Sequence, residues 1–128
     1  KVLARRFLWD VPTVPILPGF FHLTLTLNSG VAFGLFRGYG LGLTILTLAL
    51  LSALVVSSIR QGATGRSELA RWSLVLIVGG AAGNLIDRVR FGGVVDFLDF
   101  RIWPIFNLAD SCITLGAGLM AWTLLRRR

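Results

Sequence analysis

An uncharged apolar run over residues 41–59 constrains the fold of this chain more than any other feature of its sequence. A helix rises about 1.5 Å per residue, so a run of about 19 residues can cross a hydrocarbon core about 30 Å thick. The run predicts a membrane-spanning helix. The composition agrees, because 55% of the 128 residues are hydrophobic, only 15% are charged and the mean hydropathy is +0.77. A soluble domain has a smaller apolar share.

Two further apolar runs suggest additional spanning helices. The run over residues 72–86 is short for a span unless its helix continues past Asp87, and the run over residues 102–125 is long enough but carries Asp110 near its start. In both helices the polar groups lie at one end. We therefore expect an α-helical integral membrane protein with three spanning helices, organised as a single membrane-embedded domain over residues 1–128.

Two stretches alternate polar and apolar residues with the period of a half-buried strand. The first covers residues 20–27 and is followed by the turn sequence Asn28-Ser29-Gly30. The second covers residues 94–100 and places Asp96 and Asp99 on opposite faces. We expect the two stretches to pair as a small sheet on the outer surface of the membrane.

The distribution of charge predicts the orientation of the chain. Three spans would put the loop over residues 60–71 and the arginines at 126–128 on one side, which positive-inside logic makes cytoplasmic. Every acid except Glu68 would then lie on the other side, where we expect the chemistry. The net charge of +7 is scattered between apolar runs, which favours membrane lipids with anionic headgroups as partners and does not favour nucleic acid.

Several catalytic schemes lack the residues that they need. Cys112 is the sole cysteine, so no intramolecular disulfide and no cysteine pair for a metal is possible, and a small packed residue is a more common role than a nucleophile. His22 is the sole histidine and lies in a strand pattern, which favours a position on the sheet or the surface over a catalytic role. No HExxH pattern offers zinc ligands. We expect neither a metal nor a cofactor.

Carboxylates in or beside membrane spans are costly to bury and therefore indicate function. Asp87, Asp96 and Asp110 all qualify. Two facing carboxyl groups do not both ionise easily, so one stays protonated while the other is charged, and such a pair can activate a water for attack on a peptide carbonyl. Asn84 and Asn107 each precede one of these acids by three residues, which is the spacing of one helix face.

Local sequence favours one pair of these acids. Asp87 is followed by Arg88 and is more plausibly neutralised in a structural ion pair, which leaves Asp96 and Asp110 as the catalytic pair. For Asp110 alone, capping of a helix start is a more common role than catalysis, although the helix dipole there also favours a negative charge. A channel or transporter subunit and a noncatalytic scaffold are the alternatives, because glycine-rich helices with intramembrane polar residues also build ion paths.

Four segments, taken together and in order, resemble the bacterial lipoprotein signal peptidases, also called signal peptidase II. They are Asn28-Ser29-Gly30-Val31-Ala32-Phe33, Gly80-Ala81-Ala82-Gly83-Asn84-Leu85-Ile86-Asp87-Arg88, Val94-Val95-Asp96-Phe97 and Phe106-Asn107-Leu108-Ala109-Asp110-Ser111.

The resemblance implies a four-helix membrane protein with a small extracytoplasmic sheet and a catalytic aspartate pair at Asp96 and Asp110. It implies cleavage of the signal peptide before a diacylglyceryl-modified cysteine of a prolipoprotein, without metal or cofactor, in the bacterial inner membrane with the active site towards the extracytoplasmic face. It also implies inhibition by globomycin-type cyclic peptides. The residues implied to line or brace the site are Asn28, Gly30, Asn84, Asp87, Arg88, Asn107 and Ala109.

One feature departs from the family pattern. Family members begin with a further spanning helix that ends in an Asp-Gln-x-x-Lys motif, and Lys1 alone corresponds to it here. We therefore expect the chain to be an N-terminally truncated form of the family domain.

Overall fold

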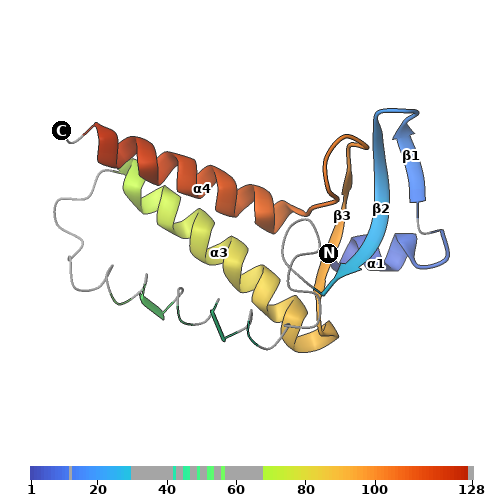
Figure 1. Cartoon of the computed structure of the whole chain (residues 1–128), viewed down its shortest axis with the longest axis horizontal. Coiled ribbons are helices and arrows are strands. Elements are labelled where there is room, and N and C mark those ends of the chain that lie inside the picture. Colours follow the sequence, from blue (N-terminus) through green and yellow to red (C-terminus); the bar gives the residue numbers. More distant parts are fainter. Residues whose placement is uncertain are drawn as a thin grey trace. The chain divides into compact units, whose positions relative to one another are not determined.

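The computed structural model of the chain describes residues 1–11, 13–29 and 68–126, together with isolated positions between 42 and 56. Two compact units are formed, one from Lys1–Leu43 and Ile86–Asn107, the other from Thr44–Leu85 and Leu108–Arg128. The described elements are α1 (Val2–Leu8), β1 (Thr13–Leu17), β2 (Phe21–Asn28), α3 (Glu68–Phe91), β3 (Val94–Asp99) and α4 (Leu108–Leu125), as Figure 1 shows.

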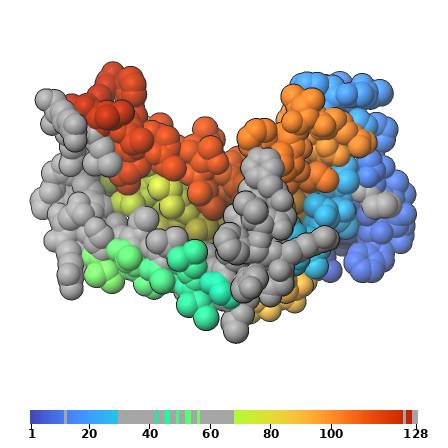
Figure 2. Space-filling view, viewed as in Figure 1, coloured from blue at the N-terminus to red at the C-terminus, as the bar shows by residue number. Residues whose placement is uncertain are grey.

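The first unit is built on an antiparallel sheet with the strand order β1-β2-β3. The predicted pairing of the two alternating stretches is confirmed, because they form β2 and β3. The edge strand β1 was not predicted, since Pro15 interrupts its pattern, and an edge is where a strand tolerates proline. The space-filling view shows β1 and β2 in blue and the residues after β3 in orange together on the surface of this unit (Figure 2).

A register shift in the sheet decides which polar residues of β2 meet the acids of β3. Between the pairs Leu23–Leu98 and Thr26–Asp96, β2 advances one residue more than β3 does. Such a bulge leaves one residue of the longer strand without its own partner and changes the side to which the following residues point. As a result, His22 and Thr24 share a face of the sheet with Asp99, whereas Thr26 and Asn28 share the other face with Asp96.

Two glycines connect α3 to β3. Gly92 has a φ of 71° and its N–H donates to the carbonyl oxygen of Arg88 at 3.0 Å, the left-handed ending that glycine permits at a helix C-terminus. A Cβ on Gly93 would lie 2.9 Å from the carbonyl oxygen of Asn28, so only glycine allows β3 to start this close to the end of β2.

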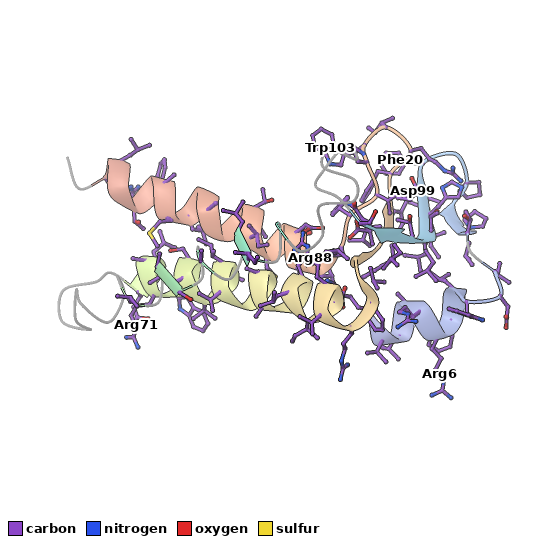
Figure 3. All side chains as sticks on the ribbon, turned by 60° about the horizontal axis from the view of Figure 1, so that its bottom comes forward. Arg6, Phe20, Arg71, Arg88, Asp99 and Trp103 are labelled. Carbon is purple, nitrogen blue, oxygen red and sulfur yellow. The ribbon has the colours of Figure 1, made fainter. Side chains whose placement is uncertain are left out.

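In the second unit, the part of α3 before Ile86 packs along α4, and the two helices lie side by side in Figures 1 and 3. Glycine makes the close approach possible. A Cβ on Gly80 would lie 2.5 Å from the carbonyl oxygen of Ala109, and one on Gly116 would lie 2.8 Å from that of Ser73. Small residues thus allow the close helix packing that is typical of membrane proteins.

The distribution of polar and apolar side chains among the described residues is opposite to that of a soluble protein. Their buried side chains are mostly polar, whereas large apolar side chains of α3 and α4 are exposed, among them Trp72, Val75, Val89, Leu115 and Leu125. Among the described helices, α3 was found long and apolar enough to cross a membrane, with only 22% of its apolar window buried. Apolar side chains that face outward on such a helix are suited to contact with lipid tails.

The predicted spans are matched in part. The helix expected over residues 72–86 does continue past Asp87 and ends at Phe91, as its length required. The helix expected from residue 102 starts at Leu108 instead, because Phe106 pairs with Leu98 of β3 and keeps the preceding residues extended. The span expected over residues 41–59 lies largely outside the described residues.

The carboxylate of Asp99 ties the strands of the sheet to the loop that follows them. It accepts hydrogen bonds from the hydroxyl of Thr24 at 2.8 Å and from the backbone N–H of Arg101 at 2.9 Å, and it forms a salt bridge with Arg101 at 3.6 Å. Burial by itself raises the pKa of Asp99, but these hydrogen bonds and the positive charge of Arg101 together bring it below its ordinary value of 3.8. Asp99 and Phe20 are labelled beside the strands in Figure 3.

The glycine contacts predict opposite effects of two neighbouring substitutions. Gly80→Ala should lower the free energy of unfolding by about 1–3 kcal/mol, because its methyl group collides with main chain that cannot move alone. Gly79→Ala is the matched control, since a Cβ there meets nothing within 4 Å, and it should gain up to about 1 kcal/mol of helix propensity. Denaturant unfolding in detergent micelles measures both, and equal stability of the two variants would contradict this packing.

The lowered pKa of Asp99 predicts a loss of stability in acid. A carboxyl group whose pKa is lower in the folded state stabilises the fold fully above its unfolded pKa, here near 3.8, and this contribution disappears as the pH falls through the folded pKa. Thr24→Val removes one donor, so the fall in melting temperature between about pH 6 and about pH 3 should be smaller in this variant than in the wild type. An identical pH profile for both proteins would show that Thr24 does not stabilise the charged form.

Candidate active site

Asp96 is the most tightly enclosed acid in the described parts of the chain. It lies in the middle of β3, directly after the buried Val94 and Val95, and is only 2% exposed. The side-chain amide of Asn28 donates to its Oδ2 at 3.2 Å, and that of Asn107 donates to its Oδ1. Each carboxylate oxygen therefore has an N–H donor, which offsets the cost of burial and fixes the plane of the group.

Backbone pairing delivers Asn107 to this carboxylate. The carbonyl oxygen of Phe106 accepts the N–H groups of Phe97 and Leu98 at 3.0 and 2.8 Å, and the N–H of Phe106 donates to the oxygen of Leu98 at 3.1 Å. The ring of Phe106 also stacks on that of Phe100, with centroids 5.9 Å apart. These contacts hold Asn107, which is fully buried, directly beside β3.

Asp110 belongs to the second unit, where it lies in the first turn of α4. The side-chain amide of Asn84, on α3, donates to its Oδ1 at 2.7 Å. The N-terminal position favours a negative charge because the free N–H groups of a helix point towards it. Ala109 lies against Gly80 and Gly83, so its small side chain lets this turn approach α3 closely.

Asp87 forms an ion pair, but with a cation other than the one expected. Its Oδ2 lies 2.8 Å from Nζ of Lys1 and accepts the N–H of Val95 at 3.0 Å. The expectation of a pair with the adjacent Arg88 was wrong, because successive residues on a helix point in different directions. Arg88 is half-buried and its carbonyl oxygen accepts the N–H of Gly92 at the end of α3.

The partners of the two asparagines could not be found from sequence spacing. Asn84 lies three residues before Asp87 but donates to Asp110, and Asn107 lies three residues before Asp110 but donates to Asp96. Both hydrogen bonds join residues from different elements, for which a single sequence carries no local signal. Sequence reasoning also missed Lys1 as a partner of Asp87. Gly30, the remaining predicted site residue, lies outside the described residues.

His22 and Cys112, the other side chains considered for catalysis, make contacts that are typical of structural residues. His22 lies on β2 as expected, is 8% exposed, and accepts a hydrogen bond at Nδ1 from Nε of Arg101 at 3.2 Å. Cys112 is half-buried on α4, where its Cβ lies close to the position of a Cβ on Gly80, so it has the packing role expected of it. Within the described ranges no group of three or more histidines, cysteines or acids could hold a metal ion.

Comparison with known proteins points to one family. The family profile described as signal peptidase (SPase) II matches residues 1–126. The lipoprotein signal peptidase of Halothermothrix orenii is 47% identical over 120 residues, which cover 94% of this chain and 81% of that protein. That of Moorella thermoacetica is 47% identical over 128 residues, which cover 98% of this chain and 82% of that protein.

Two solved structures, each described as a bacterial membrane enzyme, share the fold. One superimposes with a TM-score of 0.82 at 32% sequence identity and covers 97% of this chain and 80% of that one. The other has a TM-score of 0.79 at 31% identity and covers 99% of this chain and 88% of that one.

The two amides on Asp96 should differ in their contribution to stability. Asn107→Ala should lower the free energy of unfolding by about 1–3 kcal/mol, because Asn107 is fully buried and its loss removes a donor from a carboxylate that is itself only 2% exposed. Asn28→Ala should cost less, since Asn28 is only half-buried and water can replace its longer hydrogen bond. Denaturant unfolding in micelles ranks the two variants, and a larger loss for Asn28→Ala would reverse this assignment.

Proposed function

Because the chain belongs to the signal peptidase II family, we propose that it is an intramembrane aspartic endopeptidase that removes signal peptides from diacylglyceryl-modified prolipoproteins. In this proposal, residues 1–128 form one peptidase domain with three membrane-spanning helices. It lies in the bacterial inner membrane with its active site towards the extracytoplasmic face. It needs no metal or cofactor, its other partners are membrane lipids, and globomycin-type cyclic peptides are its expected inhibitors.

One observation supports Asp96 and Asp110 as the catalytic pair: each carboxylate receives a hydrogen bond from the side-chain amide of an asparagine. An amide orients a carboxylate without adding a charge, so it leaves the carboxyl group able to gain and lose a proton. Asp87, by contrast, is paired with the cation of Lys1 and holds a backbone N–H, which is the environment of a structural acid.

The proposed reaction needs two carboxyl groups in different protonation states. The ionised carboxylate takes a proton from a water molecule, whose oxygen attacks the carbonyl carbon of the scissile peptide, while the protonated carboxyl donates its proton to the carbonyl oxygen. The tetrahedral intermediate then collapses, the C–N bond breaks, and the leaving nitrogen receives the proton that came from water. As the C=O bond of the product acid re-forms, the carboxyl group that had protonated the carbonyl oxygen takes that proton back. Both carboxyl groups are then in their starting protonation states.

The exposed apolar side chains support a substrate that is itself anchored in the bilayer. Lipid-facing residues on α3 and α4 would leave the helices in contact with acyl chains, so a diacylglyceryl-modified precursor can approach within the membrane plane. The alternative of a channel or transporter subunit receives no such support, because the curated relatives reported above are peptidases.

Exchange of either catalytic acid should abolish cleavage. In the purified membrane enzyme, Asp96→Asn and Asp110→Asn should each lower kcat by at least about 1,000-fold, because an amide cannot accept and return the proton that water attack requires. The double variant should lose little more than either single variant, since the two groups act as a unit. The measurement is the mobility shift of a purified lipid-modified precursor on a gel.

Asp99→Asn is the matched control for this experiment. Asp99 is also buried on β3, but its partners are Thr24 and Arg101, so its exchange should weaken the sheet and leave the kcat of the folded enzyme close to that of the wild type. Near-wild-type cleavage by Asp96→Asn or Asp110→Asn would remove that residue from the mechanism. Ion flux through liposomes without any cleavage would favour the channel alternative.

A further inference from the structure

Lys1, Asp87 and Val95 form a connected set within the first unit. Nζ of Lys1 lies 2.8 Å from Oδ2 of Asp87, and the same oxygen accepts the N–H of Val95 at 3.0 Å. The side chains of Lys1 and Asp87 are 18% and 7% exposed, so the ion pair is well removed from water. A charge-assisted hydrogen bond to a backbone N–H is stronger than one between neutral groups.

The contact fixes the strand at the residue before Asp96. The N–H of Val95 is bonded to a side chain of α3, and only the φ and ψ torsions of Val95 separate this N–H from the planar peptide link to Asp96. Val95 is itself only 2% exposed, so its main chain has little freedom to shift. The position of Asp87 therefore influences where the backbone of Asp96 lies.

A second contact keeps Lys1 beside the end of α3. The guanidinium of Arg5, one turn further along α1, lies 3.9 Å from the centroid of the Phe91 ring, which belongs to the last residue of α3. This cation–π contact anchors α1 at the same end of α3 that carries Asp87. The placement of the Lys1 ammonium thus does not depend on the ion pair alone.

We propose that Lys1 is a positioning residue for Asp96. It neutralises Asp87, which in its ionised form holds the N–H of Val95 and so sets the start of β3. The inference rests on the proposed function, in which Asp96 is catalytic. Without the ammonium, the buried carboxylate of Asp87 loses this ion pair, and burial of a charge without its counter-charge is strongly unfavourable. Asp87 then turns towards water and releases Val95.

Lys1→Met tests the role of the charge, since methionine is also long and unbranched. In the purified enzyme we expect kcat for the lipid-modified precursor to fall by at least about tenfold with KM within about twofold, because Asp96 is displaced while substrate contacts remain. Lys1→Arg, which keeps the cation, should retain most of the activity. Arg6→Met is the matched control, because it removes an exposed cation from the same helix, and its kcat should stay unchanged.

A double-mutant cycle separates positioning from a general loss of structure. Asp87→Asn keeps an oxygen that can accept the N–H of Val95 but needs no counter-charge, so Lys1→Met combined with Asp87→Asn should be more active than Lys1→Met alone. Effects of the two substitutions that simply multiply would overturn the proposal. If Lys1→Met does not fold, the double variant should still fold and cleave, and its failure to do so would also overturn it.

Hydrogen exchange supplies a measurement that does not depend on catalysis. In the Asp96→Asn background, Lys1→Met should accelerate exchange in the peptide that contains Val95, whereas Arg6→Met should not. Unchanged exchange and unchanged kcat in Lys1→Met would refute the role of Lys1 and leave the proposed function intact. Full activity of Asp96→Asn would instead refute the catalytic role of Asp96, and with it the claim that Lys1 positions a catalytic group.

Discussion

A carboxylate removed from water must find hydrogen-bond donors in the protein, and this requirement at Asp96 governs much of the first unit. Among its donors, Asn28 comes from the end of β2 and Asn107 from the residue before α4. Neither could reach the acid without a specific backbone arrangement. The sheet, its register shift and the extended segment after β3 all serve to bring these amides to one strand.

Small backbone features meet this requirement. Gly93 lets β3 start against the carbonyl of Asn28, and the extra residue in β2 places the Asn28 side chain on the same face of the sheet as Asp96. The hydrogen bonds of Phe106 fix Asn107, the residue that follows it. Before the extra residue, His22 and Thr24 lie on the face of the sheet that carries Asp99. Asp99 is therefore bonded to the loop after the sheet, whereas Asp96 is held by the side-chain amides of two asparagines.

In the second unit, the helices must pack closely although their large apolar side chains point outward. Its helices present apolar side chains outward and approach each other through Gly80 and Gly116, so contact between helices depends on close main-chain packing. This packing brings Asn84 within hydrogen-bond distance of Asp110. Polar groups in an apolar environment then satisfy one another, which is the condition for keeping a carboxylate there at all.

The sequence by itself determined the class of protein, two of the strands and their pairing, the extension of α3 past Asp87, and the acids with functional potential. These features follow from composition, from local periodicity and from the cost of charge in a membrane, all of which a single chain displays. The catalytic assignment of Asp96 and Asp110 remains a proposal that the family supports. The tertiary structure alone decided the short edge strand β1, the late start of α4, the partner of each asparagine, and the pairing of Asp87 with Lys1 in place of Arg88. Each of these depends on contacts between residues far apart along the chain, and the physical reason is that a buried polar group bonds to whichever partner the fold brings near it, which local sequence does not encode.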